Sequence, residues 1–376
     1  MVPIVSAYLD RGWKVTVAAR HLPRAKEVLA ALQKIGKKRL AVVQAPIFLH
    51  RAKVFEKQPV SLADVFAQIG FADGQIWRPV IRAWRRLLDE AVPDVVLSDF
   101  APSLNVVATG HCRLFVIGNG WTVPPEGVLP TFENILNDAS TSEVSDHIVE
   151  ALEIASDGRS RLSTFSDLLR GDANFVCTLP QLDPYRLQRA GEHYWPVEIS
   201  KPGPVPVGTR DLIAVYLPEE HPALSLVQTV AEQLPWKFRA YVGDTNRVST
   251  ERLLFASEPL NLSELLPSAR LAVHHGGLGM ANWCLINRVP QLIFPTDMEK
   301  LLVGRGIENA NAGLITDRRI AADDLFAMIK SLSGAPIPQP DISAMQTVTD
   351  TETLTHLLQK SCDPRSMKPP ERKPSG

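Results

Sequence analysis

The stretch RLAVHHGGLGMANWCLINRVPQLIFPTDMEKLLVGRGIENANAGLI, from Arg270 to Ile315, alternates apolar runs with helical patterns. The first apolar run ends at a glycine-rich turn, and the second ends at Pro295 before an acidic turn. Short apolar runs that alternate with helices predict a mostly parallel sheet covered by helices on both faces. We therefore expect a doubly wound α/β domain around this stretch.

The glycine turn is the part of the stretch that could bind a ligand. Gly276, Gly277 and Gly279 remove side chains where a helix begins, and the exposed N–H groups of a helix start attract anions. His275 precedes the turn and could donate a hydrogen bond to a phosphate oxygen. Taken alone, such a turn more often serves packing, so the interpretation depends on its context.

An acidic position follows the second apolar run. Glu299 and Lys300 come after the strand that ends at Pro295, and they are expected at the same carboxyl edge of the sheet as the glycine turn. Ligands of open α/β sheets bind at that edge. A carboxylate there could accept hydrogen bonds from two neighbouring hydroxyls.

In this arrangement the stretch resembles the donor-binding signature of GT-B glycosyltransferases of the UDP-glycosyltransferase superfamily, in particular the bacterial members. In that family a strand ends in His-Gly-Gly, a helix follows, and then come Gly-x-Pro, an apolar strand, a proline and an acidic residue. Here the sequence has HGG at 275–277, VP at 289–290, Pro295 and Glu299 in register.

The resemblance implies the GT-B fold, two doubly wound Rossmann-like domains that face each other across a cleft. It also implies that His275 and the amides after it hold the donor diphosphate, and that Glu299 binds sugar hydroxyls. By position, the Pro259–Leu260 turn matches the segment that pairs with the nucleobase, and Tyr216 matches the start of the first phosphate-side loop.

Three positions depart from the family pattern. The usual Gln after the acid is Lys300, the small hydroxyl residue after the glycine turn is Met280, and an occasional ribose-binding Glu is Trp283. Lys300 could donate to a sugar hydroxyl, favour an acidic sugar or point to solvent. These departures leave the identity of the donor open.

The resemblance continues through the amino-terminal half with less specific motifs, including an Ala-Pro pair at 101–102 and GNGWTVPP at 118–125. Family members open with a strand, a glycine-rich turn and a His, whereas this sequence opens on a helical pattern with Pro3 near its start. We expect an amino-terminal domain without its first strand, whose two neighbouring strands would each lack a partner. Either the true start lies upstream of Met1, which the well-formed apolar patterns favour, or the chain is a degenerate homologue.

Asp99 is the candidate catalytic residue, because it matches the Asp that steadies the family's His base. That His is absent from the sequence, and a helix cap or turn residue is an equally good interpretation of Asp99. His21, His50 and His111 lie in no motif, and we expect surface or structural roles for all three.

One helical pattern combines an apolar face with a run of arginines. The segment IWRPVIRAWRRLLDEAVP at 76–93 places apolar residues on one face and basic residues on the other, namely Ile81, Trp84, Leu87 and Leu88 against Arg82, Arg85 and Arg86. This pattern is more typical of a solvated helix face than of an anion site.

Length and composition limit the remaining possibilities. The 376 residues suffice for two domains, and 40 Lys and Arg against 41 Asp and Glu argue against nucleic acid as a partner. Four separated cysteines indicate a reducing compartment, and neither a secretion signal nor an apolar run of about 18 residues is present, so we expect a cytoplasmic protein without an integral membrane segment.

The expected domains are 1–195, on the acceptor side, and 210–340, which binds the nucleotide sugar. A proline-rich linker at 196–209 separates them, and a helix at 341–362 and a disordered tail at 363–376 follow. The acceptor pocket is expected in loops such as those around Trp121 and Phe132.

We expect a hexosyltransferase that uses a UDP- or dTDP-sugar and a hydroxyl of a small, apolar or lipid-like acceptor, with peripheral membrane contact left open. No Asp-x-Asp motif lies near the glycine turn, so neither a metal nor a cofactor is expected, and the donor is a substrate. Two alternatives remain, a catalytically impaired nucleotide-sugar-binding homologue and, less favoured, a sugar-nucleotide epimerase of the same fold.

Overall fold

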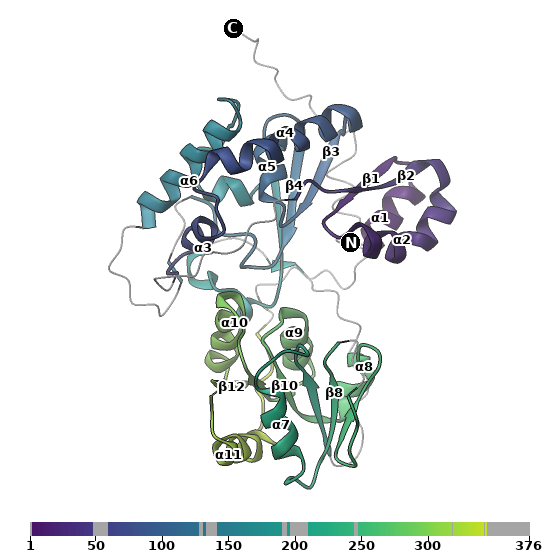
Figure 1. The fold of residues 1–376 in the computed structure, drawn as a ribbon, viewed down its shortest axis with the longest axis vertical. Helices are drawn as coiled ribbons and strands as arrows, with labels where there is room; N and C mark the ends of the chain where they lie inside the picture. The colour runs from purple at the N-terminus through teal and green to yellow at the C-terminus, as the bar shows by residue number, and fades with distance from the viewer. Residues whose placement is uncertain are drawn as a thin grey trace. The chain divides into compact units, whose positions relative to one another are not determined.

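The structure is a computed structural model, in which the chain divides into two compact units that are described separately (Figure 1). Of the described residues, one unit comprises those within 2–118 and 122–176, and the other comprises those within 119–121 and 177–343. The residues described are 2–47, 59–127, 131–132, 141–189, 194–195, 210–243, 247–317, 319–341 and 343.

The carboxyl-terminal unit contains a parallel sheet of six strands in the order β12-β11-β10-β7-β8-β9. The strands are β7 (Leu212–Tyr216), β8 (Lys237–Tyr241), β9 (Leu253–Phe255), β10 (Ala269–His274), β11 (Gln291–Ile293) and β12 (Gly313–Ile315). The helices are α7 (Leu224–Ala231), α8 (Leu262–Leu265), α9 (Leu278–Ile286), α10 (Met298–Asn309) and α11 (Ala322–Leu332).

Helices cover both faces of this sheet. On one face, Val215 and Val273 belong to a buried apolar cluster that includes residues of α7 and α11. On the other face, Ala272 and Ile293 belong to two clusters that include residues of α8, α9 and α10. Side chains of a strand alternate between the faces, so the apolar strands supply both cores. The predicted doubly wound α/β fold is confirmed for this half.

The amino-terminal unit begins with a two-stranded parallel sheet. It contains α1 (Val2–Asp10), β1 (Val15–Ala19), α2 (Leu22–Gly36), a 3-10 turn at Lys37–Arg39 and β2 (Leu40–Gln44). Val5 and Leu9 of α1 pack with Leu29 and Leu40 in one buried cluster. Gly12 has a φ of +87°, which ends α1 in the backbone conformation that glycine favours.

The rest of the amino-terminal unit forms around a second parallel sheet. Its elements are α3 (Leu62–Gln68), α4 (Gly74–Ala91), β3 (Val95–Asp99), α5 (Pro102–Ala108), β4 (Arg113–Gly118), α6 (Thr141–Ala155), a 3-10 turn at Ser166–Leu169 and β5 (Ala173–Cys177). β3, β4 and β5 pair in that order. Strand β5 and helices α3 and α6 provide regular structure that the sequence patterns left unspecified.

Strands β1 and β3 each pair on one side only within the described part of the chain. β1 pairs with β2, and β3 pairs with β4, so the two parallel sheets of this unit are separate. This separation of the two sheets agrees with the expected amino-terminal domain without its first strand.

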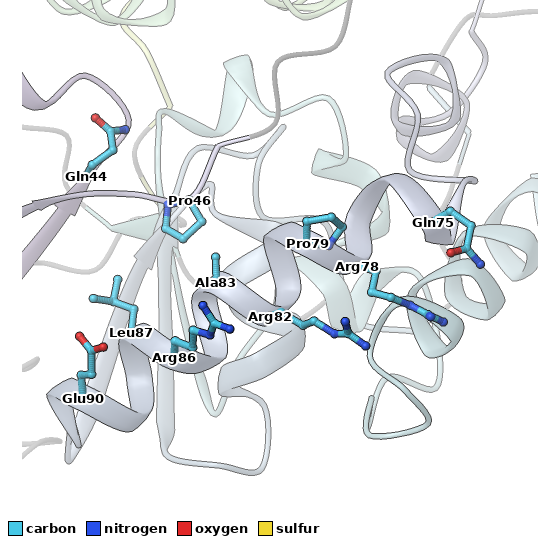
Figure 2. A pocket seen from close by; sticks show the side chains of 10 residues that line it. All are labelled: Gln44, Pro46, Gln75, Arg78, Pro79, Arg82, Ala83, Arg86, Leu87 and Glu90. Atoms are coloured by element: carbon cyan, nitrogen blue, oxygen red, sulfur yellow. The ribbon is translucent and has the colours of Figure 1, made fainter.

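Helix α4 has the amphipathic pattern predicted for 76–93. Ile81, Trp84 and Leu88 are buried, whereas Arg82 and Arg86 are exposed. Figure 2 shows Arg78, Arg82 and Arg86 of α4 beside a cavity of about 560 Å³ that Gln44 also lines. Arg82 and Arg86 are exposed, as a solvated helix face predicts, and Arg82 also forms an ion pair with Asp157 over 3.3 Å.

The division between the units falls before the predicted linker. Leu179 and Leu182 pack in the same cluster as Ala281 and Ile307, so the segment after β5 belongs to the carboxyl-terminal core. This segment contains 3-10 turns at Pro180–Leu182 and Arg186–Gln188 and the short strand β6 (Tyr194–Trp195). The predicted linker at 196–209, the helix at 341–362 apart from 341 and 343, and the tail lie outside the described residues.

No helix in the described ranges combines the length and apolarity that a bilayer crossing requires.

Candidate functional site

The site is built around the end of strand β10, where His274 is fully buried. The Gly276 N–H donates a hydrogen bond to His274 Nδ1 at 3.1 Å, so Nε2 carries the proton and donates to Gln291 Oε1 at 3.0 Å. Burial lowers the pKa of His274 to about 4, because a charged ring would be desolvated. A neutral ring therefore holds the glycine turn in place.

Gly276 joins this turn to the neighbouring helix. Its φ is +92°, and a Cβ at this position would lie 2.8 Å from the carbonyl oxygen of Lys300. Only glycine fits both the backbone conformation and the space. The turn after β10 and the first turn of α10 are thus in direct contact.

The start of α9 exposes backbone donors. Gly277 is the residue before the helix, and no side chain caps it. Among the described residues, the N–H groups of 277–280 have no hydrogen-bond acceptor, and the space beside Gly279 is open. The positive end of the helix dipole adds to these donors. The N–H of Gly276 is not among them, because it already donates to His274.

His275 borders this helix start. Its Nδ1 lies 3.3 Å from the Tyr216 carbonyl oxygen, which can only accept, so Nδ1 donates. A Cβ on Gly277 would lie 3.1 Å from His275 Nε2, which places this nitrogen next to the exposed amides. With Nδ1 engaged, Nε2 can donate to an anion only when the ring is protonated.

Apolar and aromatic side chains lie beside the turn. Tyr216, Leu260 and Trp283 pack against one buried cluster, and the Tyr216 ring lies 5.5 Å from the Tyr241 ring. Pro259 is exposed in the segment between β9 and α8. Tyr216, Leu260 and Trp283 thus border the same cluster, and the roles predicted for the Pro259–Leu260 turn and for Tyr216 stay predictions.

Glu299 lies in the first turn of α10, where both carboxylate oxygens have partners. Lys300 Nζ lies 2.8 Å from Oε2, and Asn119 Nδ2 donates to Oε1 at 3.3 Å. Asp297 caps the helix by accepting from the Lys300 N–H at 3.0 Å. Lys300 thus points toward its neighbouring carboxylate rather than to solvent, which corrects one of the options considered for it.

Asp99 ends strand β3 in the other unit. No side-chain hydrogen bond of Asp99 involves another described residue, and partial desolvation raises the pKa of its solvent-reaching carboxyl. The cap position of the following helix is Ala101, so the interpretation of Asp99 as a helix cap is wrong. Its catalytic role stays a prediction.

The other histidines considered have the following positions. His21 accepts a hydrogen bond from the Arg24 N–H at 3.2 Å at the start of α2, and His111 is exposed in a turn. The structural or surface roles predicted for these two are consistent with these positions. His50 lies outside the described residues.

The two aromatic residues predicted near an acceptor pocket are buried. Trp121 is 8% exposed and Phe132 is 1% exposed, and the Phe132 N–H donates to the Val60 carbonyl at 2.8 Å. These two side chains therefore serve packing, and the acceptor pocket expected in the loops around them stays a prediction.

Sequence patterns missed His274 and Asn119. His274 stands in an apolar strand, and only its burial between Gly276 and Gln291 shows its role. Asn119 is 180 residues from Glu299, so no local pattern could pair them.

Within the ranges that the structure describes, no group of three or more metal-binding side chains occurs.

No protein-family model matches the sequence, and no curated protein matches it either. Solved structures do. The calicheamicin glycosyltransferase CalG4 matches with a TM-score of 0.64 and 12% identity, over 98% of this chain and 95% of that one. The glycotransferase of kitacinnamycin gives 0.62 and 17%, over 96% and 95%, and the glycosyltransferase VinC in complex with DTDP gives 0.59 and 15%, over 97% and 92%.

At these identities the likeness shows the fold. The chain has the GT-B architecture of two Rossmann-like domains, as predicted from the resemblance, and the matches cover nearly its whole length.

Proposed function

We propose that the chain is a glycosyltransferase that moves a hexose from a UDP- or dTDP-sugar to a hydroxyl of a small apolar acceptor. One observation carries this proposal: the uncapped N–H groups at the start of α9 adjoin the ring of His275, and Gly276, just before them, contacts the helix that bears Glu299. The N–H groups at a helix start can bind a diphosphate, and the carboxylate of Glu299 can accept hydrogen bonds from the attached sugar.

The proposed reaction is a displacement at the anomeric carbon. The acceptor oxygen forms a bond to this carbon, the bond to the diphosphate breaks, and a base removes the acceptor proton. The amides of 277–280 stabilise the negative charge of the departing diphosphate electrostatically, so no metal is required. Glu299, oriented by Lys300 and Asn119, accepts hydrogen bonds from the sugar.

The residues beside the turn favour a donor whose nucleoside contains deoxyribose. Trp283 is half-buried and apolar, and it cannot accept a hydrogen bond from a ribose 2′-hydroxyl, which dTDP lacks. The structurally similar VinC was solved with DTDP. We expect this chain to bind dTDP at least as tightly as UDP.

A second candidate function is nucleotide-sugar binding without transfer. The observation that favours it is Asp99, whose carboxylate has no imidazole partner within the described ranges. Its raised pKa suits a proton acceptor, but an Asp without a His is a weaker base than the pair.

The test is release of UDP or dTDP from UDP-glucose and dTDP-glucose, with and without a panel of apolar alcohols, in the presence of EDTA. Acceptor-dependent release that Asp99→Asn reduces supports the transferase. Tight binding of both donors without release supports the binding protein, and absence of binding contradicts both. Loss of release in EDTA that magnesium restores would contradict the metal-independent mechanism.

A further inference from the structure

A second concave site lies at the amino edge of the six-stranded sheet. A cavity of about 500 Å³ is lined by residues that precede or begin β7, β10 and β11 or that follow α11, among them Arg210, Asp211, Arg270, Arg288 and Ile337. The glycine turn lies at the other end of β10, roughly 17 Å away for a six-residue strand. The cavity is therefore separate from the proposed donor site, and its volume is within the usual range for small-ligand sites.

The lining is strongly basic. Three arginines line the cavity together with one acidic residue, Asp211, whose side chain is 68% exposed. Asp211 Oδ1 lies 3.6 Å from Arg270 Nη1, which is beyond hydrogen-bonding distance. One partly solvated carboxylate cannot neutralise three arginines, so the cavity keeps a positive potential.

Arg270 stacks on an aromatic ring, and its Nε lacks an acceptor. Its guanidinium carbon lies 4.1 Å above the centre of the Trp236 ring, and only 20% of its side chain is exposed. Its Nε is buried and has no hydrogen-bond partner among the described residues. A buried N–H without an acceptor is costly, and a nearby anion would offset that cost.

The guanidinium of Arg210 donates hydrogen bonds to backbone carbonyls, whereas the side chain of Arg288 makes none among the described residues. Arg210 donates from Nη1 to the Arg288 carbonyl at 3.1 Å and from Nη2 to the Asn287 carbonyl at 3.4 Å, at the end of α9. Arg288 follows the helix with a φ of +51°, a conformation in which glycine would be less strained. Its exposed side chain has no ion pair or hydrogen bond in the part of the chain that the structure describes. The guanidinium of Arg288 is therefore free to bind an anion.

We propose that this cavity binds a small molecule that carries a phosphate group, through Arg270 and Arg288. A guanidinium matches the geometry of phosphate oxygens and can donate two parallel hydrogen bonds. Pro290, Pro336 and Ile337 supply an apolar wall next to the charged one, which suits the organic part of a phosphomonoester. This proposal does not depend on the function proposed for the glycine turn.

Isothermal titration calorimetry with inorganic phosphate and with phenyl phosphate tests the proposal, at constant ionic strength set by chloride. We expect both to bind, with phenyl phosphate tighter because its ring can contact Ile337. Binding of inorganic phosphate alone would identify a free phosphate site and overturn the phosphomonoester. If neither probe binds, the whole proposal is overturned.

Arg288→Gly is the decisive variant, because it removes the guanidinium and relieves the left-handed backbone, so its fold should be retained or stabilised. We expect it to weaken phenyl phosphate binding by roughly tenfold or more, the effect of a lost charge-assisted hydrogen bond. Arg239→Gln is the matched control, because Arg239 is exposed on β8 and does not line the cavity. Equal binding by Arg288→Gly and the wild type would overturn the assignment.

A second comparison separates this cavity from the glycine turn, which could itself bind phosphate. In Gly277→Asp, phenyl phosphate should still bind the arginine cavity, whereas nucleotide binding should be lost. In Arg288→Gly, nucleotide binding should be retained, whereas phenyl phosphate binding should be weakened. Loss of phenyl phosphate binding in Gly277→Asp would place the phosphate at α9 and overturn the second site.

Discussion

Asn119 donates a hydrogen bond from Nδ2 to Oε1 of Glu299 over 3.3 Å, and Lys300 occupies the other oxygen of the same carboxylate. The side chain of Glu299 is therefore held from two sides before any ligand arrives. A carboxylate has about four acceptor positions, so two stay available for sugar hydroxyls. Preorganisation of this kind lowers the entropy lost when a ligand binds.

The position of Asn119 depends on a buried ion pair. Arg189 Nε lies 2.6 Å from Asp183 Oδ2, both side chains are fully buried, and Arg189 Nη2 donates to the Gly120 carbonyl at 3.4 Å. A Cβ on Gly120 would collide with the Asp183 carboxylate, so the chain passes close to the pair at this point. The pair therefore fixes the segment that carries Asn119.

Glu299→Gln should separate sugar binding from nucleotide binding. The amide keeps the shape but loses the charge, so affinity for dTDP-glucose should fall about tenfold, while affinity for dTDP should change by less than about twofold. Calorimetry with the two ligands measures both effects. If both affinities drop equally, Glu299 does not contact the sugar.

Asn119→Ala should also weaken the binding of dTDP-glucose more than that of dTDP, but by less than Glu299→Gln does. Lys300 still orients one oxygen of Glu299, so we expect a loss of roughly threefold for dTDP-glucose. Asn119→Asp is the isosteric comparison and should lose more, because it places a second negative charge beside Glu299. Better binding by the Asp variant than by the Ala variant would contradict this orienting role.

Gly276→Ala and Gly279→Ala form a matched pair only three residues apart. At Gly276 the methyl would meet the Lys300 carbonyl and the backbone is left-handed, so the free energy of unfolding should fall by about 1–3 kcal/mol. At Gly279 the space is open, so the fold should be unchanged or slightly stabilised. Urea denaturation measures both variants, and equal losses would contradict the contact between the turn and α10.

His274 makes stability depend on pH. Its pKa is about 4 in the folded protein and 6.5 as the ordinary value, so the unfolded chain binds more protons between these pH values. The free energy of unfolding should therefore fall as the pH drops from about 6.5 to about 4, by up to about 3 kcal/mol.

The comparison variant for this effect is His274→Asn, which cannot titrate and whose amide oxygen can still accept from the Gly276 N–H. Urea denaturation from pH 7 to pH 4 should show a shallower pH dependence for the variant than for the wild type. Parallel curves would mean that His274 is not buried in the neutral form.

The glycine turn could be predicted from the sequence because its determinants are local. Strand β10, the turn and α9 follow one another directly, and the order of residues alone places His275 and Gly277 at a helix start. Register along a parallel sheet also places Glu299 at the same edge, since β11 pairs with β10. These features need no knowledge of distant segments.

Other features depend on contacts between distant segments. The predicted domain boundary relied on the proline-rich stretch, but Leu179 and Leu182 pack into the carboxyl-terminal core before it. Asn119 follows β4 in sequence and belongs to the carboxyl-terminal unit. Neither assignment can be made from periodicity, because periodicity shows which face is buried but not which partner covers it.

The comparison of Gly277→Asp with Gly277→Asn tests the central claim most directly. Both side chains have the same size, both can cap α9, and the backbone at Gly277, with φ −62° and ψ 129°, accepts either residue. If the amides of α9 bind the donor diphosphate, the Asp variant should bind dTDP and UDP at least about tenfold more weakly than the Asn variant in calorimetry. Equal affinities for the two variants would show that the diphosphate does not bind at this helix start.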